Sequence, residues 1–105
     1  MSRTLYCGQI TKQQVGERVT LNGWVQRRRD LGGMIFIDLR DREGMVQVVF
    51  DAQSDQQLLE TAETLRAEYI VEVTGTVVAR LENAINPNMT TGEIEIEATG
   101  LKILN

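Results

Sequence analysis

Residues 23–44 of the chain read GWVQRRRDLGGMIFIDLRDREG. Within this stretch, 34–40 is rich in β-forming side chains and carries an apolar residue at every second position, the period that predicts a strand. The glycines of 30–33 can adopt the positive φ that a hairpin reversal needs, and 41–44 is a second turn of the same kind. We therefore expect a strand with a short turn at each end.

Strand patterns recur on both sides of this stretch. Apolar residues alternate with polar ones before it, directly after it and again near the end of the chain. Gly75 interrupts one of these segments, which often marks a bulge or a sharp bend. The expected strands are 19–25, 34–40, 45–50, 69–80 and 93–98.

One helix is expected between the third and fourth strands. Apolar residues follow one another at helical spacing there, and Ser54 fits an N-cap with Gln57 as its capping-box partner, so the pattern predicts a helix over 54–67. A second, short helix is expected to start near Thr11 and to cover one end of the domain.

The order of these elements is three strands, one helix and two strands. It matches an all-β fold with one inserted helix, the five-stranded Greek-key barrel called the OB-fold, in which the helix joins strands three and four. An unclosed α+β sheet is the competing architecture. A length of 105 residues allows one domain, with 1–18 as an N-terminal cap segment and 19–104 as the barrel.

What the sequence lacks excludes several function classes. It has no histidine and only Cys7, too few soft ligands for a Cys/His zinc site, and it has no Ser-His or Cys-His nucleophile. No secretory signal or membrane-spanning run is visible, so a cytoplasmic location is expected. We expect neither a catalytic nor a metal site in this chain.

The charges are unevenly distributed. Residues 1–50 carry eight basic and five acidic side chains, whereas 51–105 carry three basic and ten acidic ones. The net charge of −4 therefore combines +3 in the first half with −7 in the second. This asymmetry suggests a charged partner on one face, and the alternative is a chance cluster on a solvated surface.

Strand alternation predicts which residues face outward. If Ile35, Ile37 and Leu39 point into the barrel, then Phe36 points out, and Gln47 does the same on the next strand together with Met45 and Val49. An outward aromatic ring can stack on an unpaired base, and an amide can hydrogen-bond base edges. Of the three successive arginines, Arg27 and Arg29 share one face and Arg28 takes the other.

Each of these residues also has a purely structural interpretation. Phe36 could be covered by a loop or a neighbouring domain, and Gln47 could be an ordinary strand residue. The outward carboxylates Glu93, Glu95 and Glu97 repel phosphate and protect a sheet edge, although one of them could accept from a base. A general single-strand binder and a protein-interaction domain packing through Trp24 and Phe36 are the alternatives to a specific RNA-binding module.

Stretch 23–44, the opening Tyr6-Cys7-Gly8 and the segment 86–96 (NPNMTTGEIEI) together resemble the N-terminal domain of bacterial aspartyl-tRNA synthetases. The resemblance implies an OB-fold that binds the anticodon loop of aspartate tRNA. It also implies that Phe36 stacks on the central uracil and that Gln47 hydrogen-bonds it. The residues implied for the outer anticodon bases and the adjoining loop are Arg27, Arg29, Glu95, Asn83 and Asn86.

The resemblance has further implications for the whole enzyme. The ATP- and aspartate-binding motifs of that family belong to a class II catalytic domain expected after Asn105, so ATP and Mg²⁺ are implied there and no cofactor here. The expected partners are the tRNA anticodon stem-loop and that catalytic domain, with a homodimeric parent and a monomeric isolated domain. Leu31 occupies a selectivity position and favours specificity for aspartate tRNA, the alternative being an enzyme that also charges asparagine tRNA.

Overall fold

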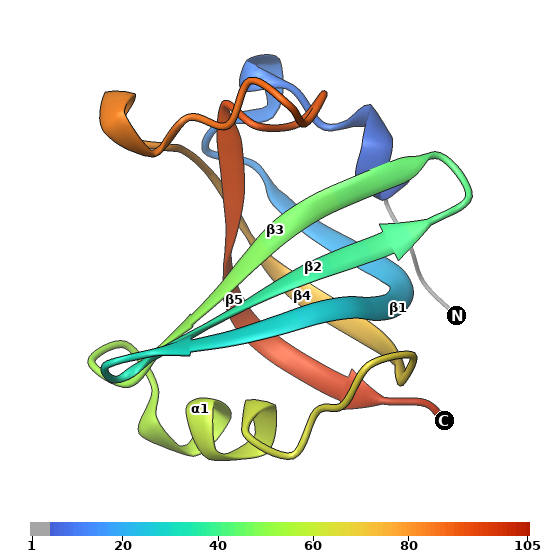
Figure 1. The fold of residues 1–105 in the computed structure, drawn as a ribbon, viewed down its shortest axis with the longest axis vertical. Helices are drawn as coiled ribbons and strands as arrows, with labels where there is room; N and C mark the ends of the chain where they lie inside the picture. Colours follow the sequence, from blue (N-terminus) through green and yellow to red (C-terminus); the bar gives the residue numbers. More distant parts are fainter. Residues whose placement is uncertain (1–4) are drawn as a thin grey trace.

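Five strands and one helix make up the fold, and the strands close into a barrel (Figure 1). The computed structural model describes residues 5–105. Its elements are β1 (Arg18–Leu31), β2 (Met34–Asp41), β3 (Gly44–Asp51), α1 (Gln56–Ala62), β4 (Ile70–Ala79) and β5 (Ile94–Ile103). The strands lie in the order β1-β2-β3-β5-β4, with β3 and β5 parallel and the other neighbours antiparallel. The predicted five-stranded Greek-key barrel is confirmed, and the open sheet is excluded.

The hairpin between β1 and β2 is tighter than predicted. Only Gly32 and Gly33 form the turn, with φ angles of 42° and 80°, and Leu31 pairs directly with Met34. Positive φ at both central residues is the geometry whose twist matches two antiparallel strands, and glycine adopts it without steric cost. β1 therefore runs through the arginines to Leu31, well past the predicted end at residue 25.

A bulge in β1 bends this strand between two partners. The first part of β1, up to Trp24, pairs with β4, and the part from Trp24 onward pairs with β2. The β1–β2 register shifts between Val25 and Arg27, which leaves Gln26 as the extra residue. An extra residue increases the local twist and bend of a strand, so β1 can turn the corner that closes the barrel.

The helix begins and ends inside its predicted range. Asp55, rather than Ser54, is the N-cap, and its side chain accepts from the Leu58 N–H at 3.0 Å. A carboxylate at that position satisfies a free N–H group of the first turn. The helix ends at Ala62 instead of continuing to residue 67. The predicted N-terminal helix is present as a 3₁₀ turn, Lys12–Gln14, which is capped by the Thr11 side chain.

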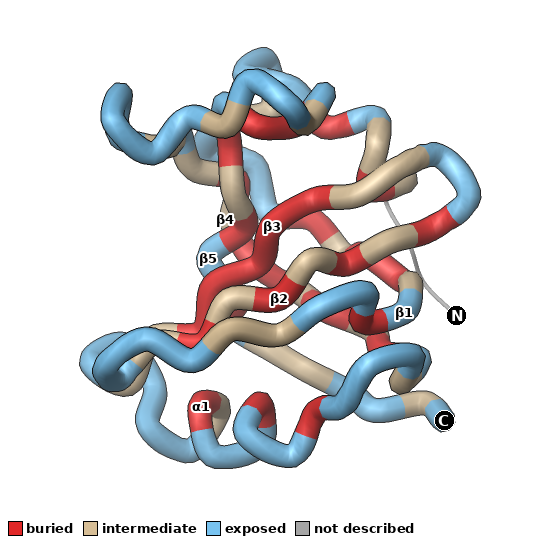
Figure 2. The backbone as a smooth tube through the Cα atoms, viewed as in Figure 1, coloured by how far each residue is buried: buried red, intermediate tan, exposed pale blue. Residues whose placement is uncertain are grey.

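The apolar core lies inside the barrel, and buried residues recur along all five strands (Figure 2). Inward residues of all five strands are buried, Leu59, Ala62 and Leu65 close one end, and Cys7 and Ile10 belong to the same apolar cluster. Burial on β3 is broader than alternation predicts: Val49 pairs with outward Phe36 and so faces out, yet it is only 4% exposed. β3 lies between β2 and β5, and Val49 is paired with Phe36 on one side and with Glu97 on the other.

A second irregularity lies near Gly75, where a bulge or bend was predicted. The β4–β5 register shifts between Thr74 and Gly75, because Thr74 pairs with Gly100 whereas Gly75 pairs with Ala98. The extra residue is therefore Thr99 on β5. A side chain at Gly75 would meet the main-chain oxygen of Glu97 at 2.4 Å, so the close approach of the two strands requires glycine here.

Candidate nucleic-acid interface

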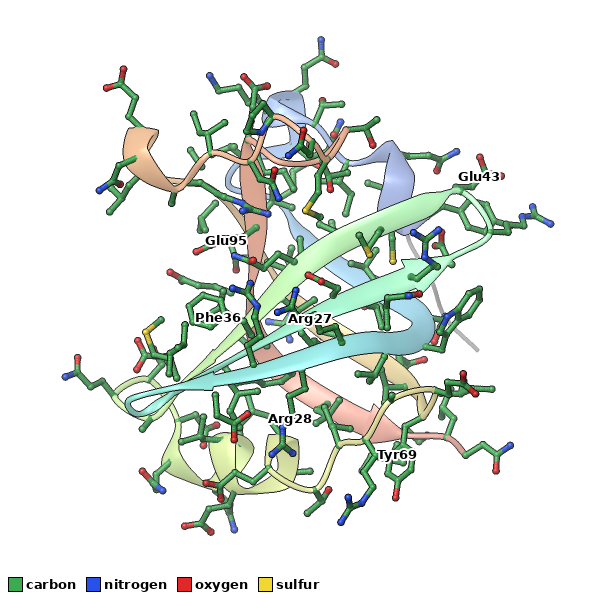
Figure 3. All side chains as sticks on the ribbon, in the orientation of Figure 1. Arg27, Arg28, Phe36, Glu43, Tyr69 and Glu95 are labelled. Carbon is green, nitrogen blue, oxygen red and sulfur yellow. The ribbon has the colours of Figure 1, made fainter. Side chains whose placement is uncertain are left out.

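The outer face of β2 carries a row of half-buried side chains, Phe36, Asp38 and Arg40, that alternates with buried inward residues. Cross-strand pairing aligns Arg29 of β1 with Phe36, and Gln47 of β3 with Asp38. The three strands therefore present an arginine, an aromatic ring and an amide on one surface. Figure 3 shows Arg27, Phe36 and Glu95 on this side of the sheet, whereas Arg28 points towards α1.

Polar groups on this surface form a continuous hydrogen-bonded chain. Arg29 Nη2 donates to Gln47 Oε1 at 2.9 Å, and Gln47 Nε2 donates to Glu95 Oε1 at 2.9 Å. The Arg29 guanidinium also lies over the Phe36 ring, 5.4 Å from its centroid, a cation–π distance. We name Arg29, Phe36, Gln47 and Glu95 the outer network. It fixes the orientation of Gln47, which is only 7% exposed.

The parallel pairing of β3 with β5 brings Glu95 into the outer network. Val48 pairs with Ile96, so the neighbouring outward residues Gln47 and Glu95 come side by side although they are 48 positions apart in the chain. Glu97 on the same strand and Glu93, in the turn just before it, are exposed. One carboxylate of the acidic strand thus belongs to the polar surface, and the other two face solvent.

Arg80 is a residue that the sequence interpretation missed. Its guanidinium donates to the Ile94 main-chain oxygen at 2.9 Å and to the Ala84 oxygen at 3.2 Å, so it ties the loop before β5 to the barrel. Burial lowers the pKa of Arg80, the charges of Glu95 and Asp38 oppose that shift, and the charge of Arg29 adds to it. The only sequence signal was an arginine at the end of a strand.

Other predicted site residues lie apart from the outer network. Arg27 is exposed on the same face, opposite Asp38 in the β1–β2 ladder. Leu31 is at the tip of the β1–β2 hairpin and 54% exposed. Asn83 is exposed in a 3₁₀ turn, and Asn86 shapes the loop after it by accepting the Asn88 N–H with its side-chain oxygen at 2.9 Å.

Arg28 takes the opposite face, as predicted, and its role there is structural. One of its nitrogens donates to the main-chain oxygens of Glu63 and Leu65, and the guanidinium also pairs with Asp30 at 2.9 Å. The Glu63 and Leu65 oxygens lie just past the end of α1, where main-chain acceptors need partners from outside the helix. Arg28 therefore fastens the end of α1 to the barrel.

At the other end of the barrel, the Asp41 carboxylate accepts from the Cys7 N–H at 2.7 Å. Burial raises the pKa of the Cys7 thiol, and Asp41 adds to that rise through its charge and a hydrogen bond to the thiol. Across residues 5–105 no group of three acidic, cysteine or histidine side chains is arranged to hold a metal ion. No helix of this part of the chain is long and apolar enough to cross a membrane.

Proteins of similar sequence are tRNA ligases. The chain is 58% identical over 103 residues to an aspartate–tRNA ligase of Bacillus licheniformis, and the match covers 98% of the chain and 17% of that relative. It is 59% identical, with the same coverage, to an aspartate–tRNA(Asp/Asn) ligase of Geobacillus sp. WCH70. The chain thus spans only a small part of the length of the curated relatives that it matches.

Solved structures share the architecture. An asparaginyl-tRNA synthetase from Pyrococcus horikoshii, complexed with asparaginyl-adenylate, has a TM-score of 0.83 at 27% identity, covering all of this chain and 23% of that one. The OBody AM2EP06, bound to hen egg-white lysozyme, has a TM-score of 0.87 at 27% identity, covering all of this chain and 95% of that one. Residues 19–104 match the family model described as OB-fold nucleic acid binding domain. Because this match covers most of its length, the chain belongs to the family of OB-fold nucleic acid binding domains.

Proposed function

We propose that the chain binds the anticodon loop of an aspartate tRNA on the outer face of β1, β2 and β3. The observation that carries this proposal is the outer network, in which an outward aromatic ring lies beside an amide whose orientation is fixed by an arginine and a glutamate. A ring of this kind stacks on an unpaired base, and a fixed amide distinguishes one base edge from another.

The amide of Gln47 has the capacity to read a base without leaving the outer network. An amide oxygen accepts two hydrogen bonds and its nitrogen donates two. Arg29 and Glu95 use one of each, which leaves one acceptor and one donor on adjacent atoms. This pair complements the edge of uracil, which offers a donor next to an acceptor, and Phe36 supplies the stacking surface for the same base.

The remaining contacts are proposed around this central base. Arg27 and Arg29 contact phosphates or the outer bases, since guanidinium groups pair with phosphate oxygens and with guanine edges. Glu95 accepts from an outer base, and the loop of Asn83 and Asn86 borders the same site. Arg80 holds that loop in place through the Ile94 and Ala84 main-chain oxygens.

The proposal extends to the whole protein of which this sequence would be the N-terminal part. That protein attaches aspartate to its tRNA in the cytoplasm, with ATP and Mg²⁺ in a class II catalytic domain outside these 105 residues, and it is a homodimer through that domain. The chain alone is a monomer that binds RNA but does not charge it. The relatives include ligases named for aspartate tRNA and others named for aspartate and asparagine tRNAs, and Leu31 favours the first type.

The test is a binding titration of the chain with an aspartate anticodon stem-loop, followed by fluorescence anisotropy at several salt concentrations. We expect salt-dependent binding that weakens when the central uracil is replaced by cytosine, or when Phe36→Ala removes the ring. Stacking energies of about 1–3 kcal/mol per base predict a loss of roughly 5- to 150-fold for the latter. The control is Val15→Ala, which removes an exposed side chain outside both the outer network and the loop of Asn83 and Asn86. Equal affinity for stem-loops of any sequence would contradict the proposal.

A further inference from the structure

A hollow of about 270 Å³ lies between the first part of β1, the β2–β3 turn, the start of β4 and the segment before β1. Among its lining residues are Tyr6, Asn22, Trp24, Asp41 and Ile70. None of these belongs to the outer network.

The floor of this hollow holds an unsatisfied amide. Asn22 is 9% exposed, and neither the oxygen nor the nitrogen of its side chain has a hydrogen-bond partner within residues 5–105. Buried polar groups without partners are rare in folded proteins, since each one loses its bonds to water. Both atoms are covered by other atoms of the chain, so the unsatisfied amide costs stability, and the groups open to a partner are the apolar side chains around it.

The rim of the hollow is apolar and open. Trp24 and Ile70 are cross-strand neighbours on β1 and β4, and they are 38% and 41% exposed. Both also line a second hollow of about 310 Å³ together with Glu68. Adjoining hollows that share two large exposed apolar side chains form a patch of the kind that proteins use to bind one another. We name Asn22, Trp24 and Ile70 the β1–β4 patch.

The end of the chain is fastened to this patch. The Ile70 N–H donates to the Asn105 main-chain oxygen at 3.1 Å, and the Leu104 N–H donates to the Ile70 oxygen at 2.8 Å. A polypeptide that continues beyond Asn105 therefore leaves the barrel next to Ile70. In the curated relatives the matched stretch is 17% of the length, so most of each relative lies outside it.

The charges around the patch favour a protein partner over RNA. Asp41 lines the first hollow, Glu68 lines the second, and Glu72 is the β4 partner of Asn22. Arg42 also lines the first hollow and lies over the Tyr6 ring, 4.5 Å from its centroid. Three carboxylates against one guanidinium repel a phosphate backbone but do not oppose an apolar protein surface.

We propose that the β1–β4 patch is the docking surface for the rest of the ligase chain, whose apolar side chains cover Trp24 and Ile70. This inference rests on the proposed function, because it requires the chain to be the N-terminal part of an aspartate–tRNA ligase. It assigns the two faces of the barrel different partners: RNA on the outer network, protein on the β1–β4 patch.

The test compares the chain alone with a full-length chimera, in which residues 1–105 replace the matched stretch of the Bacillus licheniformis ligase. Hydroxyl-radical footprinting read by mass spectrometry measures the modification rate of each side chain. We expect the rate at Trp24 to fall at least about fourfold in the chimera, because residues at the centre of an interface are desolvated. The rate at Phe36 stays the same until an aspartate anticodon stem-loop is added, and then falls.

Two matched variants separate docking from folding. Ile70→Asp in the chimera should restore the Trp24 rate to that of the isolated chain, whereas Val15→Asp, at an apolar residue that is 44% exposed elsewhere, should not. Circular dichroism of the isolated variants confirms that each still folds.

Three results would overturn the docking proposal: equal Trp24 rates in chain and chimera, protection of Trp24 by the stem-loop in the isolated chain, or protection that rises with the concentration of the isolated chain. The second result would assign the patch to RNA and the third to a second copy of the chain. If the stem-loop fails to protect Phe36 in the chimera, the proposed function is wrong, whatever happens at Trp24.

Discussion

Two outward amides on this barrel differ in how their hydrogen bonds are satisfied. Gln47 on β3 is 7% exposed, and its oxygen and nitrogen both have partners, Arg29 and Glu95. Asn22 on β1 is 9% exposed, and within residues 5–105 neither of its atoms has one. The two side chains are equally buried, so burial alone does not explain the difference.

The difference reflects which side chains surround each amide. Around Gln47, charged neighbours on three strands hold the amide in one orientation and leave it one donor and one acceptor for a ligand. Around Asn22 the hollow is lined by Trp24 and Ile70 and also by charged residues such as Asp41, yet none of them hydrogen-bonds the amide. A pre-organised amide lowers the entropy lost on binding, whereas a buried amide without partners lowers the stability of the chain that carries it.

The largest effect is expected from Gln47→Leu, which keeps the volume and removes the amide. The substitution takes away the base contact and leaves the charges of Arg29 and Glu95 without their shared partner. Hydrogen bonds that involve charged groups contribute about 1.5–3 kcal/mol, so affinity for the aspartate anticodon stem-loop should fall roughly 10- to 150-fold. Fluorescence anisotropy at fixed salt measures it. The matched control is Asn22→Leu, and an equal loss there would show that the effect does not depend on the outer network.

The second prediction concerns how folding stability depends on pH through the Cys7 thiol. Cys7 is hydrogen-bonded to Asp41, which lines the same hollow as Asn22. Because burial raises the pKa of the Cys7 thiol, the folded chain keeps that proton above about pH 8.5, where an unfolded chain loses it. The stabilisation is complete below that pH and is lost as the pH rises towards the folded pKa, by up to about 1.4 kcal/mol per pH unit. Urea unfolding between pH 7 and 10 should show this decline, and Cys7→Ala should lack it. Parallel pH profiles for the two chains would contradict the expectation.

The third effect is a gain in stability. If Asn22 lacks partners in the isolated chain, Asn22→Leu replaces an unsatisfied amide with an apolar side chain of similar volume. We expect the free energy of unfolding in urea to rise by about 1 kcal/mol. Gln47→Leu should lower it, because there the amide has partners to lose. A destabilised Asn22→Leu chain would mean that the amide contributes to the fold of the chain itself.

The sequence predicted the outward amide and ring because both depend on local alternation. Phe36 and Gln47 are each flanked by inward apolar residues, and the period of two needs no knowledge of distant strands. It fails on β1. Strict alternation from inward Val25 would point Arg27 and Arg29 inward, but the extra residue Gln26 inverts the order, so both face out. A bulge of this kind leaves no mark in the hydrophobic pattern.

Contacts between segments far apart in the chain could not be predicted from the alternation of apolar and polar residues. The bond between Gln47 and Glu95 requires β3 and β5 to pair in parallel, in a register that follows only from closure of the barrel. The role of Arg80 could not be predicted for the same reason. Its partners are the main-chain oxygens of Ala84 and Ile94, which lie within and after the loop that follows β4. Nothing in the sequence indicated that Asn22 is buried without hydrogen-bond partners, because a polar residue on the outward face of a strand is ordinarily solvated.

The smallest effect distinguishes neighbouring arginines on the two faces of β1. Arg27 is exposed on the face proposed for RNA, whereas Arg28 donates to Asp30 and to main-chain oxygens beyond α1. Each phosphate that a protein neutralises on a single strand contributes about 0.7 to the slope of log affinity against log salt concentration. Arg27→Gln should therefore reduce the slope for the anticodon stem-loop by about that amount, while Arg28→Gln leaves it unchanged and instead lowers stability to urea. If Arg28→Gln flattened the salt dependence as much as Arg27→Gln, charge anywhere on β1 would suffice, and the bulge that turns Arg27 and Arg29 outward would have no part in binding.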